Sequence, residues 1–337
     1  MIRRIRSACA KKEPGSGGGD STARWVPKRK KRRSKLSLRE GLRTNRRLAS
    51  PFIRALLSAA IIFFAGPVSG VAAPQRIVSL TPGVTETLFA LGVGERVVGV
   101  SRYCDYPPEA LTRPKVGTFL APVVEAVAAL RPDLVLTSPS PGNHEPVAAM
   151  ERAGLKVVTV PEGSASVLEV LGSIRAVGEI VAATTAADRL IAGIEQELAT
   201  VADKARGRPL VATAVVVGHD PLVLAGPQSY LGELVVHAGG ANVADPLGGK
   251  WPRAGLELLF AAQPQVIIDL SMGSEAPAVA GRWRTLGDLP AVKAGRVYFD
   301  ASLVLLHPGP RLGSQAVLLS RFLHPESWQE TSESKRD

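Results

Sequence analysis

The sequence predicts an α/β protein of two Rossmann-like lobes with mostly parallel sheets, joined by one long rigid helix, with a ligand cleft between the lobes. Short apolar runs alternate with helical-period segments in both halves of the 337-residue chain. A Pro-free stretch, residues 166–206, separates these two sets. A repeated unit also occurs: "VEAVAALRPDLVLTS" (124–138) returns as "LELLFAAQPQVIIDL" (256–270), each with a Glu seven residues before a Pro.

The first half alternates short Val, Ile and Leu runs with longer periodic segments. The runs predict strands at 76–80, 96–101, 134–137 and 156–160. In the first intervening helix, Thr81 is the expected N-cap, Pro82 the first helical residue and Gly92 the stop. Apolar strands alternating with helices indicate a mostly parallel sheet covered on both faces.

The middle segment is predicted to be helical. Apolar residues recur there at three- and four-residue spacing, which is the helical period; they are Leu190, Ile191, Ile194, Leu198 and Val201. A helix of about twenty residues spans roughly 30 Å, the width of a small domain. Such an element joins two lobes more stiffly than a loop does.

Strand and helix alternation restarts in the second half. Strands are predicted at 209–217, 266–270 and 296–299, and helices at 230–240, 256–263 and 309–323.

The predicted organisation is a basic leader with a signal peptide (1–73), an N-terminal lobe (74–165), a helical segment (166–207), a C-terminal lobe (208–325) and a disordered tail (326–337).

The net charge of +11 comes from the leader. Residues 1–54 contain 18 Lys and Arg but three acids, whereas the remainder contains 23 basic and 27 acidic residues. The globular part is therefore mildly acidic, and a nucleic-acid partner is not expected. The basic run "KRKKRRSK" at 28–35 is read as an oversized positive flank or as sequence ahead of the true start.

An uncharged stretch, residues 55–75, has the features of a secretory signal, with a cut expected after Ala73. The alternative is an uncleaved membrane anchor, since about twenty uncharged residues can span a bilayer. The expected location is the periplasm, by the Sec or the twin-arginine route. Of the two cysteines, Cys9 lies in the leader, so Cys104 has no disulfide partner, and no Cys near the cut could accept a lipid.

Signals of catalysis are poor, so no catalytic residues and no metal site are predicted. The chain has no G-x-S-x-G elbow and no phosphate-binding G-x-x-x-x-G-K-[ST] loop, and His144-Glu145 lacks the second His of a zinc protease motif. A site of several His could still assemble from His144, His219 and His307, although spaced single His residues are more often ordinary loop or core residues.

Two acids open the repeated units. A helix that precedes a parallel strand starts on the side where the strands end, so Glu125 and Glu257 are expected at the cleft mouth, one for each lobe. Each Glu also complements a helix N-terminus, which is worth a few tenths of a kcal/mol. Both explanations can hold.

The segment from "RIVSLTPGVTETLFALG" through "SRYCDYPPEA" to "LRPDLVLTS" resembles the ABC-transporter substrate-binding proteins for cobalamin, iron-siderophores and haem. The resemblance covers residues 75–325, with looser matches at "GGANV", "WP" and "PGPR", and is nearest to the cobalamin-binding members. It implies the two-lobed fold and a large metal-chelate ligand such as cobalamin, with no resident cofactor.

The resemblance also implies roles for particular residues. Tyr103, Phe119 and Trp251 match aromatic positions of the corrinoid site, with Phe119 in place of a Trp. His307 is a candidate axial ligand for haem, an alternative to Tyr103, and Arg311 matches a basic residue at the cleft edge. Glu125 and Glu257 match the acids that dock onto the membrane permease.

The expected function is capture of a corrinoid, or of an iron-siderophore or haem, for an ABC importer. The expected partners are the permease with its ATPase subunits and a small-molecule ligand, and the chain is expected to be a monomer. An enzyme using the same cleft and a sensory module are the alternatives from other classes.

Overall fold

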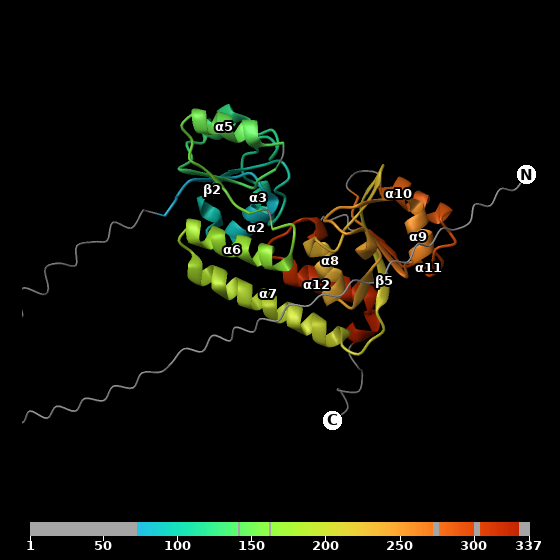
Figure 1. Ribbon diagram of the computed structural model, residues 1–337. Coiled ribbons are helices and arrows are strands. Elements are labelled where there is room, and N and C mark those ends of the chain that lie inside the picture. Colours follow the sequence, from blue (N-terminus) through green and yellow to red (C-terminus); the bar gives the residue numbers. More distant parts are fainter. Residues whose placement is uncertain (1–72, 141, 162, 272–275, 300–303, 330–337) are drawn as a thin grey trace, which may run out of the picture. The chain divides into compact units, whose positions relative to one another are not determined.

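The computed structural model describes residues 73–140, 142–161, 163–271, 276–299 and 304–329 (Figure 1). The leader and signal peptide predicted over 1–73 lie outside this part except for residue 73, and so do residues 330–337 of the predicted tail. The described residues all fall within one compact unit, Gly70–Asp337. No helix in this part of the chain is long and apolar enough to cross a membrane.

The first half contains a four-stranded sheet in the order β2-β1-β3-β4, with every pair parallel. Its strands are β1 (Ile77–Ser79), β2 (Val97–Val100), β3 (Leu134–Thr137) and β4 (Val157–Thr159). The four predicted strands are confirmed. All residues of β1 and β3 are buried, which explains why these strands read as continuous apolar runs.

Helices and one 3-10 turn connect these strands. They are α2 (Pro82–Ala90), η1 (Gly94–Arg96), α3 (Pro108–Leu111), α4 (Val124–Ala129) and α5 (His144–Arg152). As predicted, Thr81 is the N-cap of α2 and Pro82 its first residue, and Gly92 adopts a φ of 77° after its end. The side chain of Thr81 makes no capping hydrogen bond, so the Pro and the Gly set the helix limits.

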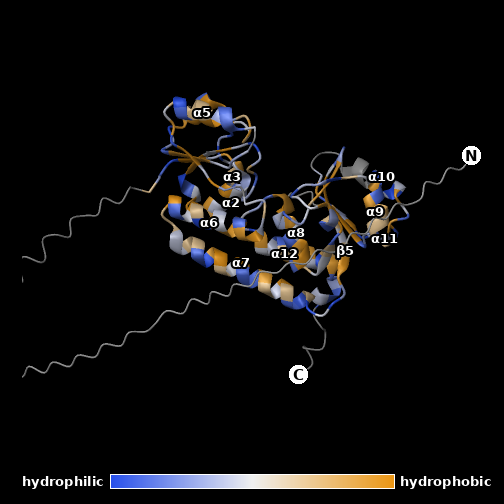
Figure 2. Cartoon of the chain, viewed as in Figure 1, coloured by the Kyte–Doolittle hydropathy of each residue, from blue (hydrophilic) through white to orange (hydrophobic). Residues whose placement is uncertain are grey.

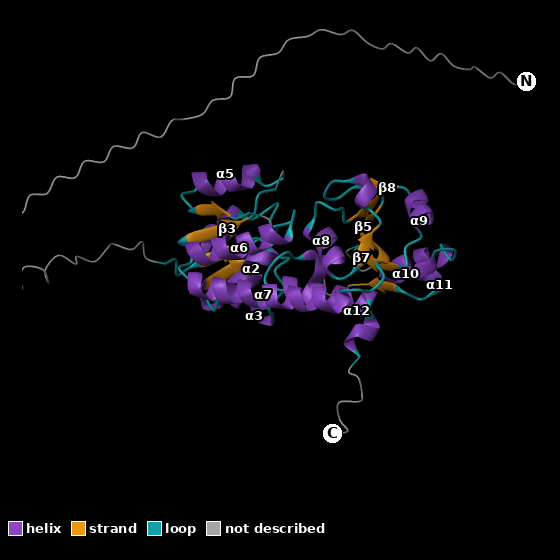
Figure 3. Cartoon of the chain, turned by 60° about the horizontal axis from the view of Figure 1, so that its bottom comes forward, coloured by secondary structure: helices purple, strands orange, loops and turns teal. Residues whose placement is uncertain are grey.

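The second half contains a separate six-stranded sheet (Figure 3). Its strands are β5 (Val211–His219), β6 (Leu222–Leu224), β7 (Gly240–Asn242), β8 (Arg253–Ala254), β9 (Val266–Asp269) and β10 (Val297–Phe299). The order is β10-β9-β5-β6-β8, and β7 also pairs with β5. The sheet is mostly parallel, as predicted, but β6 runs antiparallel to both β5 and β8.

Helices and 3-10 turns complete this half of the chain. They are α8 (Tyr230–His237), η2 (Asp245–Leu247), α9 (Leu256–Ala262), α10 (Ala276–Thr285), α11 (Pro290–Lys293), η3 (Val304–Leu306), α12 (Leu312–Leu323) and η4 (Pro325–Trp328). The turn η4 corrects the tail expected to be disordered from residue 326. Trp328 donates a hydrogen bond to Ser320 and lies under the ammonium of Lys204, so packing orders this segment.

The predicted helical segment forms two helices, α6 (Val167–Ile180) and α7 (Thr184–Ala205). The chain reverses between them at Ala182, which has a φ of 57°. The apolar stripe of α7 is buried against α6, α8 and α12, and Figure 2 shows apolar and polar residues alternating along the helix. With 22 residues, α7 is about 33 Å long. The predicted domain limits at residues 165 and 207 stay predictions.

The repeated sequence units have the same local structure. In each, a helix ends at a residue of positive φ, Arg131 (46°) or Gln263 (47°), followed by the Pro and a central parallel strand. The residue after the Pro binds the start of the neighbouring strand: Asp133 accepts from the backbone of Gln75, and Gln265 accepts from that of Ala212. The two repeated sequence units therefore form the same helix, Pro and strand arrangement, one in each half of the chain.

The turn between α6 and α7 gives a stability prediction. Ala182→Gly should stabilise the protein by about 0.5–1 kcal/mol, because a positive φ strains an Ala but not a Gly. Ala199→Gly, at an exposed position inside α7, should destabilise it by about 1 kcal/mol. Urea unfolding followed by circular dichroism measures both changes, and a loss of stability in the Ala182 variant would contradict the strain assigned to this turn.

Candidate ligand-binding site

A pocket of about 470 Å³ opens where the parallel strands of the first sheet end. It is lined by residues that follow β1, β2 and β3, by Phe119 and its neighbours, by Ser173 of α6 and by the segment Leu306–Pro308. Ligands of open α/β sheets bind at this edge, and the volume lies in the range of small-molecule sites.

Two predicted aromatic residues meet in this pocket. The ring centroids of Tyr103 and Phe119 lie 6.2 Å apart with the planes at 63°, an edge-to-face arrangement. Tyr103 is 44% exposed, so one side of the pair is open to the pocket. Together with Val84 and Leu306 the rings form an apolar wall that suits a flat ligand.

The loop that carries Tyr103 is fixed from both sides. The backbone N–H of Arg102 donates to the carbonyl of Gly117 at 2.7 Å, and Lys115 Nζ donates to the carbonyl of Cys104 at 2.9 Å. The thiol of Cys104 is buried and accepts a hydrogen bond from Thr85. Burial raises the pKa of the Cys104 thiol, so the thiol stays neutral. Its hydrogen bond with Thr85 holds the loop next to Tyr103 in place.

Phe119 is presented by a tight turn that needs a glycine. Gly117 has a φ of 99°, and a Cβ at this position would lie 2.5 Å from the carbonyl oxygen of Ala121. The turn is closed by hydrogen bonds between Thr118 and Ala121 in both directions. Only Gly fits here, which fixes the position of the Phe119 ring opposite Tyr103.

An acid on α2 forms the main charge cluster beside the pocket. Glu86 is almost fully buried and receives two hydrogen bonds from the guanidinium of Arg311, Nε to Oε2 at 2.7 Å and Nη2 to Oε1 at 2.6 Å. His307 Nδ1 lies 3.2 Å from the same carboxylate. The guanidinium of Arg311 also stacks over the ring of Tyr106, 4.2 Å from its centroid. Bidentate pairing is the strong form of an ion pair.

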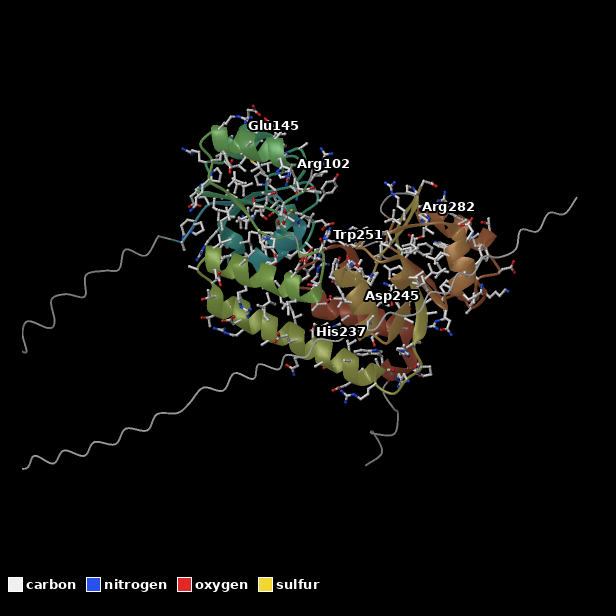
Figure 4. All side chains as sticks on the ribbon, in the orientation of Figure 1. Arg102, Glu145, His237, Asp245, Trp251 and Arg282 are labelled. Carbon is white, nitrogen blue, oxygen red and sulfur yellow. The ribbon has the colours of Figure 1, made fainter. Side chains whose placement is uncertain are left out.

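The structure gives three predicted ligand residues different positions relative to the pocket. Arg311 was expected to meet the ligand at the cleft edge, but it does not line the pocket and its guanidinium is bound to Glu86. His307 does line the pocket, with one ring nitrogen directed to Glu86. Trp251 is 38% exposed in the loop before β8 and is not among the described residues that line the pocket (Figure 4).

A second polar network lies where β5 and β9 end. The buried carboxylate of Asp269 accepts from Trp283 Nε1 at 2.6 Å and from the backbone N–H of Ser271 at 3.0 Å, and lies 2.8 Å from His219 Nε2. Because a carboxylate only accepts hydrogen bonds, Nε2 donates its N–H to Asp269. Carboxylates orient His ligands toward metals in this way.

The three His residues considered for a metal site are not brought together. His219 binds Asp269, His307 binds Glu86, and His144 begins α5. Within the described residues, no group of three or more His, Cys, Asp or Glu could hold a metal ion.

Glu125 and Glu257 occupy equivalent positions. Each is exposed in the first turn of its helix, α4 or α9, at the start of a repeated unit. Neither forms an ion pair within the described part of the chain, so both carboxylates are available to a partner.

Sequence reasoning missed the acids that organise both networks. Glu86 is the only charged residue of α2, and an acid in an otherwise apolar helix was the signal that could have found it. Asp269 ends a buried apolar strand, which is a similar signal. Their partners could not be found, because Arg311 and Trp283 come from distant or separate elements.

Residues 77–302 match the model of the periplasmic binding protein family, which covers most of the described chain. The chain belongs to the periplasmic binding protein family. It is therefore a binding protein of a transport system and not an enzyme, as the sequence predicts. The predicted two-lobed α/β class is likewise confirmed by the solved relatives.

The ABC transporter substrate-binding lipoprotein YvrC of Bacillus subtilis is 32% identical over 76% of this chain and 82% of its own. The vitamin B12-binding protein of Pectobacterium carotovorum is 26% identical over 72% and 85%. Among solved structures, the periplasmic haem-binding protein RhuT of Roseiflexus in its apo form is 30% identical, with a TM-score of 0.68 over 75% of this chain and 99% of that one.

The buried pair gives a second stability prediction. Glu86→Gln should destabilise the protein by about 3 kcal/mol, because it leaves the guanidinium of Arg311 largely buried without a counter-charge. Glu95→Gln removes an exposed partner of Arg113 and should cost less than about 0.5 kcal/mol. Urea unfolding of both variants checks this, and equal effects would show that the buried pair is not structural.

Proposed function

We propose that this protein is the substrate-binding component of an ABC importer and captures a flat metal tetrapyrrole, with a corrinoid as the ligand to test first. The observation that carries the proposal is the Tyr103–Phe119 pair over an apolar pocket at the carboxyl edge of a parallel sheet. Aromatic faces bind flat, partly apolar rings. The relatives named vitamin B12-binding proteins support the corrinoid.

Haem is the second candidate, and a specific feature favours it. His307 lines the pocket and its Nδ1 is directed to the carboxylate of Glu86, which is the way a carboxylate orients a metal-binding imidazole. Corrinoids offer a metal too, but haem requires an axial ligand from the protein. The relatives named haem-binding proteins, RhuT among them, support this alternative, and an iron-siderophore would use the same pocket without the imidazole.

The proposal includes partners and location. Glu125 and Glu257 dock onto basic residues of the permease, one from each half of the chain, and the ATPase subunits on the permease consume ATP. The two acids begin structurally equivalent units, which supports a pair of matching contacts. The protein acts in the periplasm as a monomer after a signal peptide is cleaved near Ala73.

Ligand titration tests the binding role. Cyanocobalamin, cobinamide, haemin and ferric siderophores are titrated into the purified protein by calorimetry, and 1:1 binding of a tetrapyrrole is expected. Tyr103→Ala should weaken it about tenfold or more by removing one face of the wall. Phe260→Ala, at a similarly exposed aromatic outside the pocket, should not change it. If none of the ligands binds, the function is not capture of a metal chelate.

Charge reversal tests the docking role and separates transport from sensing. Glu125→Lys with Glu257→Lys should abolish ligand uptake by cells while the affinity of the purified protein is unchanged, because neither residue lines the pocket. Glu179→Lys, an exposed acid on α6, is the matched control and should leave uptake intact. Normal uptake by the double variant would refute the docking assignment.

A further inference from the structure

Helix α9 is apolar on both of its faces. The inward face packs into the core of the second half through three residues: Leu258, Leu259 and Ala262. The outward face contains Leu256 and Phe260, which are 45% and 41% exposed, and Glu257, the only charged residue of the helix. A surface helix normally turns polar residues to solvent, and a helix that is apolar all round is normally buried. The outward face of α9 therefore has the composition of a surface that another molecule covers.

Helix α4 repeats this pattern in the first half. Its inward face packs into the core through three residues: Val124, Ala126 and Val127. Its exposed residues are Glu125, Ala128 and Ala129, and Glu125 is again the only charged residue of the helix. In the two repeated units Ala128 stands at the position of Phe260. Each half thus presents one acid within an apolar face, and the larger apolar side chains belong to α9.

Helix α5 shows the ordinary pattern of a surface helix. Its exposed residues are all polar or charged: His144, Glu145, Glu151 and Arg152. Two of them, Glu145 and Arg152, form an ion pair on the helix surface. By contrast, neither Glu125 nor Glu257 has an ion-pair partner in the described part of the chain. The apolar outward faces of α4 and α9 are therefore not a general property of the protein surface.

The apolar surroundings decide what each acid can bind. An ion pair that stays exposed to water contributes little and is screened by salt. Apolar side chains that close around a charge pair exclude water, which lowers the local dielectric constant and strengthens the attraction. A matching partner surface therefore has a basic residue surrounded by apolar side chains. A second copy of this chain does not fit, because its own faces present acids and like charges would meet.

We infer that the outward faces of α4 and α9 are apolar docking faces for the permease, and that apolar packing around each acid supplies most of the affinity. The Leu256–Phe260 pair makes the stronger of the two contacts, since α4 offers the smaller side chains of Val123 and Ala128. The inference rests on the proposed function, in which the two acids dock onto the permease, and adds the chemistry of the surface around them.

The test measures binding of the fluorescently labelled protein to right-side-out membrane vesicles from the cells that make it, which expose the outer face of the permease. Sedimentation at increasing protein concentration should show saturable binding that unlabelled protein displaces. Leu256→Ser with Phe260→Ser should weaken this binding about ten- to a hundredfold, because two exposed apolar side chains lose their partner surface. Leu168→Ser, at an exposed Leu of α6, is the matched control and should bind as the native protein does.

Salt and a charge on α4 test the same inference independently. Raising NaCl from about 0.1 M to about 0.5 M should change the native affinity for the vesicles less than about threefold, since a charge pair enclosed by apolar groups is screened little. Ala128→Lys should weaken binding about tenfold, because it places a positive charge against the basic residue of the permease. Ala199→Lys, at an exposed position of α7, is its control and should not change binding.

Native binding by the Leu256 and Phe260 double variant would overturn the inference, and so would loss of native binding at the higher salt concentration. In either case the docking role of the acids stands if Glu125→Lys with Glu257→Lys abolishes vesicle binding. If the native protein shows no saturable binding, the proposed docking fails and the inference fails with it. Circular dichroism should show the native fold in every variant, because all the replaced side chains are exposed.

Discussion

The buried carboxylate of Glu86 is the constraint on which the candidate site depends. A carboxylate in such a position is tolerated only with a charged partner, and Arg311 supplies one from 225 residues further along the chain. The contact fixes α2, in the first half of the chain, to the segment that begins α12. A Cβ on Gly83 would lie within 3 Å of the carbonyl oxygen of Pro308, so the two backbones touch directly. The wall of the pocket formed by His307 and Pro308 is positioned by this pair.

Helix α7 extends the same framework. It packs against α6, which contacts α2, and against α12, which carries Arg311 at its start. The contacts from Glu86 to Arg311 at the start of α12, from α12 to α7, from α7 to α6 and from α6 back to α2 form a closed ring. Such a ring leaves little freedom for a wide hinge motion, which suits a protein that presents its ligand without large rearrangement.

The repeated units show how two halves can present matching features. Each pairs a first-turn Glu with a left-handed helix end, a Pro and a central strand, and each anchors its strand by a side chain directly after the Pro. The local physics repeats although the sheets differ, since in the second sheet β6 runs antiparallel to both β5 and β8. This repetition places Glu125 and Glu257 at equivalent exposed positions, although the loops at the ends of the two sheets differ.

The sequence by itself determined the α/β class and the positions of the main strands and helices, because hydrophobic period, Pro and Gly act over a few residues. Only the tertiary structure decided the tasks of the polar residues. Arg311 was expected at the ligand and is bound to Glu86, while Arg102 next to Tyr103 was overlooked and lines the pocket unpaired. Whether a charge serves structure or ligand depends on which distant side chain lies within about 3 Å of it, and no local pattern encodes that distance.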